Sequence, residues 1–227
     1  MDDFTKDGIR IISVENILEG EDFVKELLYK NSDPKTVLFL SGGKTPKALY
    51  NQLLLEARLV YGAVGMIDER YGKIGHERSN ALIMDKFSPF YPILNSETLE
   101  KTALQYDETA RYLFNYFQKS IGLLGIGSDG HTAGIPAIPQ IADKILENRS
   151  DLVTFYDAKD GFYNERITFT FNAIRKLDQI IIMAFGEDKK FALEMVFKEG
   201  PIVETPARFY KDPEIARKTI LITDQKM

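Results

Sequence analysis

The chain has 227 residues, the size of one large domain, and we expect a single domain over residues 1–227. A net charge of -5 without a lysine-arginine block argues against a nucleic-acid or anionic-membrane surface, and no apolar run approaches the ~20 residues that cross a bilayer. The first residues have no apolar signal-peptide core, and without cysteine there are no disulfides or thiolate sites, so we expect a cytoplasmic protein with no metal and no cofactor.

Strand-like runs rich in β-branched and aromatic residues alternate with helical stretches, which is typical of parallel βαβ units. We expect strands at Ile9–Val14, Thr36–Ser41, Gly62–Ile67, Ile121–Gly125, Val153–Tyr156, Arg166–Thr170, Gln179–Phe185 and Thr219–Thr223. Apolar residues at helical spacing predict helices over 107–119 and 187–198. The pattern favours one α/β domain with a doubly wound, mostly parallel sheet and helices on both faces.

Ligands bind outside the carboxyl ends of the strands in such sheets, and the loop Ser-Gly-Gly-Lys-Thr-Pro at residues 41–46 occupies one of these positions. Its paired glycines allow close backbone approach, and Pro46 suits the first turn of a helix whose free amides can receive a phosphate. The alternative is a tight strand-to-helix turn without a ligand. A Walker A motif is excluded, because its first glycine would fall at Leu38, inside the strand.

Asp-Glu-Arg at residues 68–70 ends the next strand and is followed by a polar loop that contains His76, Ser79 and Asn80. Acids and an arginine at the carboxyl end of a strand can bind sugar hydroxyls or a phosphate. The alternative for the charged residues is a solvated cluster without a ligand. The alternative for Ser79 or Asn80 is a cap on the helix that follows.

The third loop, Gly-Ile-Gly-Ser-Asp-Gly-His-Thr at residues 125–132, contains one of the two histidines, His131. Its glycines match a bare G-x-G-x-x-G, but a dinucleotide fingerprint must open a helix, and Gly134, Pro136 and Pro139 make a helix there unfavourable. Imidazole titrates near pH ~6.5, so a histidine placed beyond a strand can act as a base. An ordinary surface histidine is the alternative.

Five motifs in chain order resemble those of the 6-phosphogluconolactonase family: SGGKTP, IDERYGKIGHERSN, LLGIGSDGHTA, ERITFTF and FGEDKKFAL. The resemblance spans about residues 37–192 and implies a Rossmann-like α/β fold shared with glucosamine-6-phosphate deaminases. It further implies a sugar-phosphate lactone as substrate and lactone hydrolysis as the reaction. We expect the protein to be a monomer or a small homo-oligomer.

The resemblance also implies roles for particular residues. His131 would be the catalytic base, with Asp129 orienting it or bracing the loop, and Arg70 or backbone amides would oppose the oxyanion. The substrate would contact Ser41, Gly42, Gly43, Lys44, Thr45, Asp68, Arg70, Arg166 and Lys189, with the SGGKTP loop, Arg166 and Lys189 on the phosphate.

The chain departs from the family pattern in three places. Lys44 stands where serine or alanine is usual, Tyr71-Gly72-Lys73 replaces the start of the loop after Asp-Glu-Arg, and Gly134-Ile135-Pro136-Ala137 follows the histidine loop. In the deaminase relatives, a glutamate lies seven residues after the aspartate of the histidine motif. Here that position is Pro136, so the carboxylate that would assist ring opening is missing.

A third alternative is a sugar-phosphate sensor that binds without catalysis. Such sensors usually carry a DNA-binding or partner module, and no basic helix-turn-helix pattern is visible before Ile9 or after Thr223. The sequence therefore favours the lactonase, and turnover of a lactone would separate the enzyme from the sensor.

Overall fold

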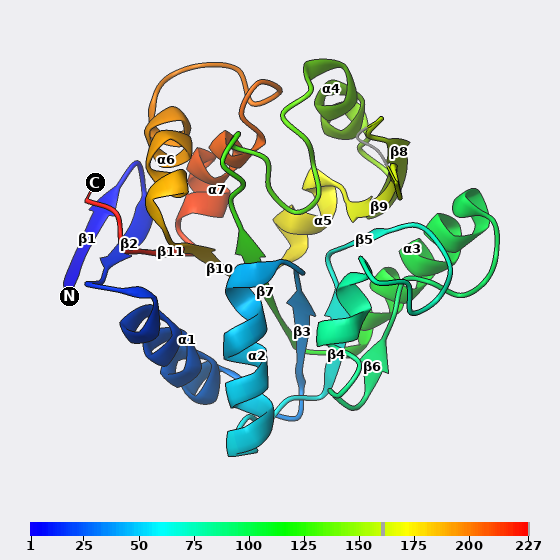
Figure 1. Cartoon of the computed structure of the whole chain (residues 1–227), viewed down its shortest axis with the longest axis horizontal. Helices are drawn as coiled ribbons and strands as arrows, with labels where there is room; N and C mark the ends of the chain where they lie inside the picture. Colours follow the sequence, from blue (N-terminus) through cyan, green and yellow to red (C-terminus); the bar gives the residue numbers. More distant parts are fainter. Residues whose placement is uncertain (160–161, 227) are drawn as a thin grey trace.

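Within residues 1–159 and 162–226, which the computed structural model describes, eight strands form the main sheet in the order β1-β2-β11-β10-β7-β3-β4-β6 (Figure 1). Their bounds are β1 Asp2–Lys6, β2 Ile9–Ser13, β3 Thr36–Leu40, β4 Ala63–Met66, β6 Phe90–Tyr91, β7 Lys119–Gly125, β10 Gln179–Ala184 and β11 Thr219–Thr223. Neighbouring strands pair in parallel except at the β1–β2 hairpin. The predicted mostly parallel α/β sheet is confirmed.

The direction of winding reverses between β3 and β7, which are direct neighbours. From β3 the chain passes through α2 (Lys44–Glu56) outward to β4, whereas β10 and β11 follow β7 in the other direction. Right-handed crossovers of opposite direction place helices on opposite faces. Accordingly, α1 (Ile17–Asn31) and α2 lie on one face, and α6 (Lys190–Phe197) and α7 (Pro213–Ala216) on the other (Figure 1). The reversal creates a switch point, where ligands bind in such sheets.

Three strands form a second, antiparallel sheet in the order β5-β9-β8, with bounds β5 Asp68–Arg70, β9 Glu165–Phe169 and β8 Val153–Asp157. The strands predicted at Val153–Tyr156 and Arg166–Thr170 are confirmed as β8 and β9, but the sequence pattern gave no sign of their antiparallel pairing, and it ended the preceding strand at Ile67 and so missed β5. Seven residues, 158–164, separate β8 from β9. A parallel crossover needs a dozen or more residues, so these strands can only form a hairpin.

Most predicted helices occur, with shifted ends. The helix expected over 107–119 is α3, Leu99–Tyr116, which begins earlier because Thr98 caps it and stops before Lys119 enters β7. The segment 187–198 divides into η2 (Glu187–Lys189) and α6. The remaining helices are α4 Pro139–Glu147, α5 Phe171–Lys176, η1 Asn80–Ile83 and η3 Pro206–Lys211. Since α4 begins only at Pro139, the histidine loop opens no helix, as expected.

The core joins both sheets. Phe169 of β9 packs edge-on against Phe39 of β3, with ring centroids 5.0 Å apart, and both rings are fully buried. On α2, Leu49, Tyr50 and Leu53 are buried against the core. No helix in the described part of the chain is long and apolar enough to span a membrane.

Candidate active site

A cleft of about 860 Å³ opens where the chain leaves β3, β4, β7 and β10. It brings together every residue expected at the substrate site apart from Lys44, namely Ser41, Gly42, Gly43, Thr45, Asp68, Arg70, Asp129, His131, Arg166 and Lys189. The side chain of Lys44 lies outside the described part of the structure. The cleft sits at the switch point between β3 and β7, where the winding predicts a ligand.

The loop that carries His131 is closed by its own hydrogen bonds. The amide of Gly127 donates to the carbonyl of His131 over 2.9 Å, and the amide of Gly130 donates to the carbonyl of Gly127 over 3.0 Å. Below the loop, the buried Thr132 hydroxyl donates to the Gly125 carbonyl at 2.8 Å and lies 2.7 Å from the Tyr210 hydroxyl. The imidazole is therefore held on a fixed turn at the end of β7.

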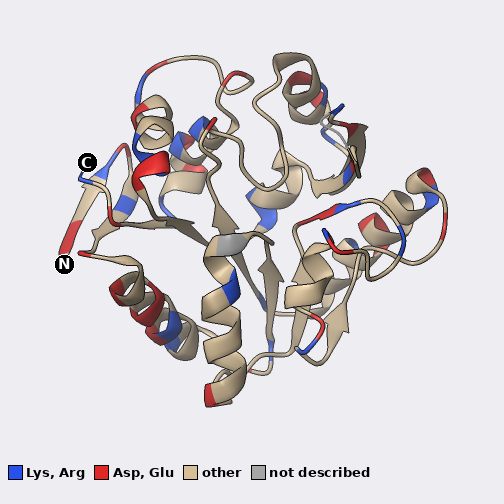
Figure 2. Cartoon of the chain, viewed as in Figure 1, with Lys and Arg blue, Asp and Glu red and all other residues tan. Residues whose placement is uncertain are grey.

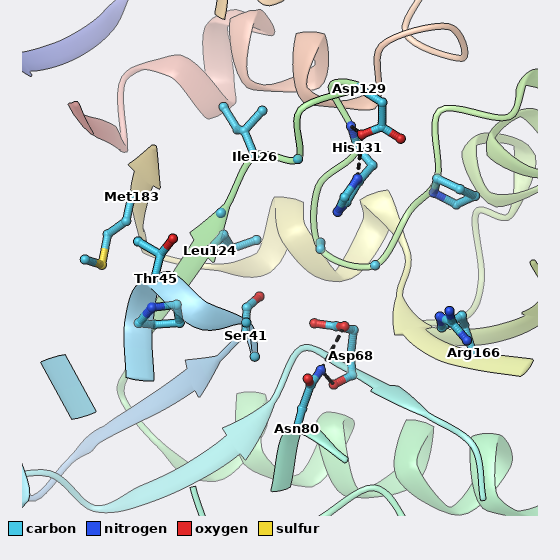
Figure 3. Close-up of a pocket in the computed structure, with 18 of the residues that line it drawn as sticks. Ser41, Thr45, Asp68, Asn80, Leu124, Ile126, Asp129, His131, Arg166 and Met183 are labelled. Carbon is cyan, nitrogen blue, oxygen red and sulfur yellow. Dashed lines mark hydrogen bonds and ion pairs between the residues drawn. The ribbon is translucent and has the colours of Figure 1, made fainter. Parts of the chain in front are cut away.

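His131 and Asp129 are joined by a hydrogen bond, with Nδ1 2.6 Å from Oδ1. An ionised carboxylate only accepts hydrogen bonds, so Nδ1 carries the proton and Nε2 keeps its lone pair. About half of the imidazole surface is exposed, at 49%, and Figure 3 shows the ring directed into the cleft toward Ser41 and Asp68. The arrangement presents a base to a ligand in the cleft.

The hydrogen bond from His131 lowers the pKa of Asp129 to about 2. We expect the Asp129 carboxyl to stay ionised in a carbon-13 NMR titration until the pH approaches 2. A depressed carboxyl pKa stabilises the fold above the ordinary value near 3.8, and this contribution is lost as the pH falls toward 2. Replacing His131 by Asn should return the Asp129 pKa toward 3.8; an unchanged value would contradict the pairing.

Gly127 leaves room for the imidazole. A Cβ at this position would lie 2.0 Å from both Cε1 and Nδ1 of His131, so Gly127→Ala should displace the ring and lower kcat by at least ~10-fold. Gly125→Ala is the matched control, because its Cβ would meet nothing nearer than the Met183 carbonyl at 3.7 Å. We expect the control to lose much less activity at equal thermal stability; equal losses would show that the imidazole is not what Gly127 accommodates.

A buried carboxylate, Glu69, fixes the second loop of the cleft. It is fully buried and accepts hydrogen bonds from the hydroxyl of Ser79 and from the amides of Arg70, Asn80 and Ala81, at 2.7 to 3.1 Å. These bonds attach η1 to β5. Ser79 also caps η1, which is the alternative role that the sequence offered for it.

Asn80 connects the ligand-facing groups. Its amide nitrogen donates to the backbone oxygen and the carboxylate of Asp68, each at 3.0 Å (Figure 3). Its oxygen accepts from Nη1 of Arg70 at 3.1 Å. A Cβ on Gly42 would lie 1.9 Å from the same oxygen. Only glycine at position 42 lets the first loop approach Asn80 this closely.

The pKa of Asp68 is raised by burial and by repulsion from Glu69, while Arg70 and His131 act in the opposite direction. Asp68 therefore lies close enough to His131 for the charge of the imidazole to act on its carboxyl group. Within the described residues, no three His, Asp or Glu side chains are grouped so that they could hold a metal ion.

The amino end of α2 faces the cleft without a side-chain cap. Gly43 precedes the helix with a φ of 110°, a conformation that favours glycine, and Thr45 lies in the first turn. Uncapped amides at a helix start attract anions. Lys189 also lines the cleft and pairs with Asp188 at 2.9 Å, so a cation lies in the same cleft as these amides.

Arg166 lies on the other side of the cleft from Thr45 (Figure 3). It belongs to β9, where it is the direct partner of Arg70 in β5, and its guanidinium donates to the carbonyl of Tyr163. The structure therefore places Arg166 beside Arg70, whereas the resemblance groups it with the phosphate loop.

His76 does not line the cleft. Its Nε2 lies 3.0 Å from the Arg70 carbonyl, its Nδ1 accepts from the amide of Arg78 at 3.3 Å, and its ring stacks on Tyr163 at 3.9 Å. Both ring nitrogens are occupied by the backbone, so His76 braces the loop.

Sequence reasoning missed several cleft residues. Asn80 was considered only as a cap, and Asp188, Tyr156 and Phe185 were not selected, although all four line the cleft. The available signal for Asn80 was its place in the polar loop that follows Asp68–Arg70. Phe185 and Tyr156 resemble ordinary strand residues, and nothing in their local sequence distinguishes them.

A doubly wound α/β sheet with an anion-attracting helix start and a hydrogen-bonded Asp-His pair at its switch point has the geometry of an enzyme that binds a small anionic ligand. Residues 21–220 match the family of glucosamine-6-phosphate isomerases and 6-phosphogluconolactonases, and the chain belongs to this family.

Individual relatives agree with the family assignment. The chain is 33% identical over 188 residues to a 6-phosphogluconolactonase of a Nostoc species, covering 75% of each chain. It is 27% identical over 217 residues to a glucosamine-6-phosphate deaminase of Clostridium perfringens, covering 85% of this chain and 86% of that one. The solved 6-phosphogluconolactonase of Plasmodium vivax superposes with a TM-score of 0.81 at 17% identity, covering 99% of this chain and 94% of that one, which shows a shared fold.

Proposed function

We propose that this chain hydrolyses 6-phospho-D-glucono-1,5-lactone to 6-phosphogluconate. The observation that carries the proposal is the 2.6 Å contact between Asp129 and His131, which leaves Nε2 as an acceptor facing the cleft. The Nostoc relative and others in the family bear the same activity in their names. The expected cytoplasmic location and the monomeric or small homo-oligomeric state stay predictions.

In the proposed reaction, Nε2 of His131 takes a proton from a water molecule as the water oxygen bonds to C1 of the lactone. Asp129 stabilises the imidazolium that forms. The bond from C1 to the ring oxygen then breaks, and the ring oxygen takes a proton from His131 to become the C5 hydroxyl. The product is a single open-chain molecule with a hydroxyl at C5 and a carboxylic acid at C1, and the acid ionises at neutral pH.

Hydrogen-bond donors are available for the oxygen on C1. Arg70 lines the cleft beside Asp68, and a positive guanidinium stabilises negative charge that develops during attack. The hydroxyl of Ser41 is buried and has no hydrogen-bond partner among the described residues. An unsatisfied buried hydroxyl is costly, so we assign Ser41 to a substrate oxygen.

We assign the phosphate to the start of α2, where Gly42, Gly43 and Thr45 lie, with Lys189 as the cation. The phosphate would replace Asp188 as the partner of Lys189, or share the ammonium group with it, since that pair is 2.9 Å apart.

The second candidate is deamination of glucosamine 6-phosphate, the activity in the name of the Clostridium relative. Pro136 lines the cleft at the position where the deaminase pattern has glutamate. The cleft carboxylates among the described residues are Asp68, Asp129 and Asp188. The missing glutamate favours the lactonase.

One enzyme preparation given both substrates separates the candidates. We expect loss of the lactone faster than its spontaneous hydrolysis, and no ammonia from glucosamine 6-phosphate above a blank. Ammonia release without lactone turnover would favour the deaminase, and binding of either compound without turnover would favour a sensor.

A further inference from the structure

A second cavity, of about 400 Å³, lies between β1, α6 and the residues that follow β11. Among the described residues, none that lines this cavity also lines the cleft. Its wall contains lysines from three separate parts of the chain: Lys6, Lys190, Lys198 and Lys226. Figure 2 shows basic residues on these neighbouring elements in the upper left of the view. The fold therefore gathers positive charge in one cavity outside the cleft.

These four lysines lack a counter-charge in the described part of the protein. None of them makes an ion pair there, whereas the ammonium groups of Lys25, Lys101 and Lys211 lie 2.8 to 3.9 Å from carboxylate oxygens. Glu194 is the single carboxylate residue among those that line the cavity. The whole chain has a net charge of -5, so the positive excess is local. A wall with mostly one sign of charge attracts ligands of the opposite sign.

Part of the wall is held in place by packing. Phe197 of α6 packs against the core, and the ammonium nitrogen of Lys6 lies over its ring, 4.8 Å from the centroid. An aromatic face attracts a cation, so this contact orients Lys6. Leu193, which also lines the cavity, is 1% exposed. The cavity therefore has an apolar base on which a lysine rests.

The residues after β11 are fixed by hydrogen bonds. Gln225 lines the cavity and is 7% exposed, and its side-chain nitrogen donates to the carboxylate of Asp224 at 2.7 Å. The same carboxylate accepts from the amide of Gly186 at 3.0 and 3.1 Å, which attaches this segment to the turn before η2 and α6. The side-chain oxygen of Gln225 accepts no hydrogen bond from a described residue. A largely buried side chain of the wall thus keeps an acceptor for a hydroxyl group of a ligand.

The size and the charge of the cavity limit the class of ligand. A volume of about 400 Å³ is typical of small-molecule sites. The lysine ammonium group is a compact point charge and a common phosphate binder. One phosphate monoester has about 1.5 to 2 negative charges at neutral pH, so four lysines fit a ligand with more than one phosphate group.

We propose that this cavity is a second binding site, separate from the cleft, for a small molecule that carries two or more phosphate groups. The lysines bind its phosphate oxygens, and the ligand supplies the counter-charge that the described residues do not provide. The proposal does not rest on the proposed function, because the cavity shares no described residue with the cleft.

The test is an NMR titration of the protein with inorganic triphosphate, followed at the side-chain amide signals of Gln225. We expect a saturable shift, with affinity for triphosphate at least ~10-fold higher than for inorganic phosphate, because the longer anion makes additional charge-assisted contacts. The double variant Lys6→Gln/Lys198→Gln should weaken triphosphate by at least ~10-fold. Lys6→Arg/Lys198→Arg keeps both charges and should retain most of the affinity.

Lys30→Gln and Lys189→Gln are the controls. Lys30 is an exposed lysine of α1 outside the cavity, and Lys189 lies in the cleft, so both variants should leave the titration of Gln225 unchanged. Sodium chloride at the same ionic strength should give no saturable shift. An equal loss of affinity in Lys30→Gln would overturn the proposal by showing attraction to the overall charge, and an equal loss in Lys189→Gln would place the triphosphate in the cleft. The absence of a saturable shift at millimolar triphosphate would overturn it as well. A protein that shows the titration but hydrolyses no lactone would keep this site and refute the proposed function.

Discussion

Replacing His131 by Asn should lower kcat for the lactone by about 10²- to 10⁴-fold, the usual contribution of general-base catalysis. The reason is geometric: Asp129 fixes the proton on Nδ1 at 2.6 Å, and Nε2 is then the acceptor that faces the cleft. Asparagine fits the space but cannot take the proton from water. Affinity for 6-phosphogluconate should change little, and initial rates with calorimetry measure the two effects separately.

His76→Asn is the control for this variant. His76 is 7% exposed and bonded to the backbone of Arg70 and Arg78, so its loss should loosen the loop but leave proton transfer intact. The wild-type rate should also fall at acid pH, because a protonated imidazole cannot act as a base. A near wild-type kcat for His131→Asn, after subtraction of spontaneous hydrolysis, or a larger loss for His76→Asn, would show that another group activates water.

Removal of the substrate phosphate should have a comparably large effect. If the α2 amides and Lys189 hold the phosphate, several charge-assisted hydrogen bonds of about 1.5–3 kcal/mol each are lost, and kcat/KM for unphosphorylated gluconolactone should be at least ~10³-fold lower. Parallel progress curves with the two lactones measure this ratio.

The variant Lys189→Gln tests whether Lys189 binds the phosphate of the substrate. It should lower kcat/KM for the phosphorylated lactone by about 10- to 100-fold, as expected for one charge-assisted contact, and leave the unphosphorylated lactone nearly unchanged. Equal turnover of the two lactones by the wild-type protein would remove the phosphate assignment. If the Lys189 variant lowers kcat/KM equally for both lactones, the phosphate binds elsewhere in the cleft.

Much of the main sheet could be predicted from the sequence, because its buried parallel strands are short apolar runs such as Thr36–Leu40 and Thr219–Thr223. The small sheet was missed because periodicity reports a strand but not its partner. Only the seven-residue connection between β8 and β9 excluded a parallel crossover.

The candidate site was predictable where loop chemistry is unusual, as at Gly43 and His131. It was not predictable where long-range packing decides, as between Gly42 and Asn80, which are 38 positions apart in the sequence. The pairing of Arg70 with Arg166 is a matter of strand register, and register across so long a separation is set by the assembled fold.

The most direct test of the central claim is the initial rate at which purified protein hydrolyses 6-phosphoglucono-1,5-lactone, corrected for the spontaneous reaction and measured over a range of enzyme concentrations. The account predicts a rate that is proportional to enzyme concentration, saturates with lactone and disappears almost completely in His131→Asn. A rate no greater than spontaneous hydrolysis, from folded protein that still binds 6-phosphogluconate, would contradict it.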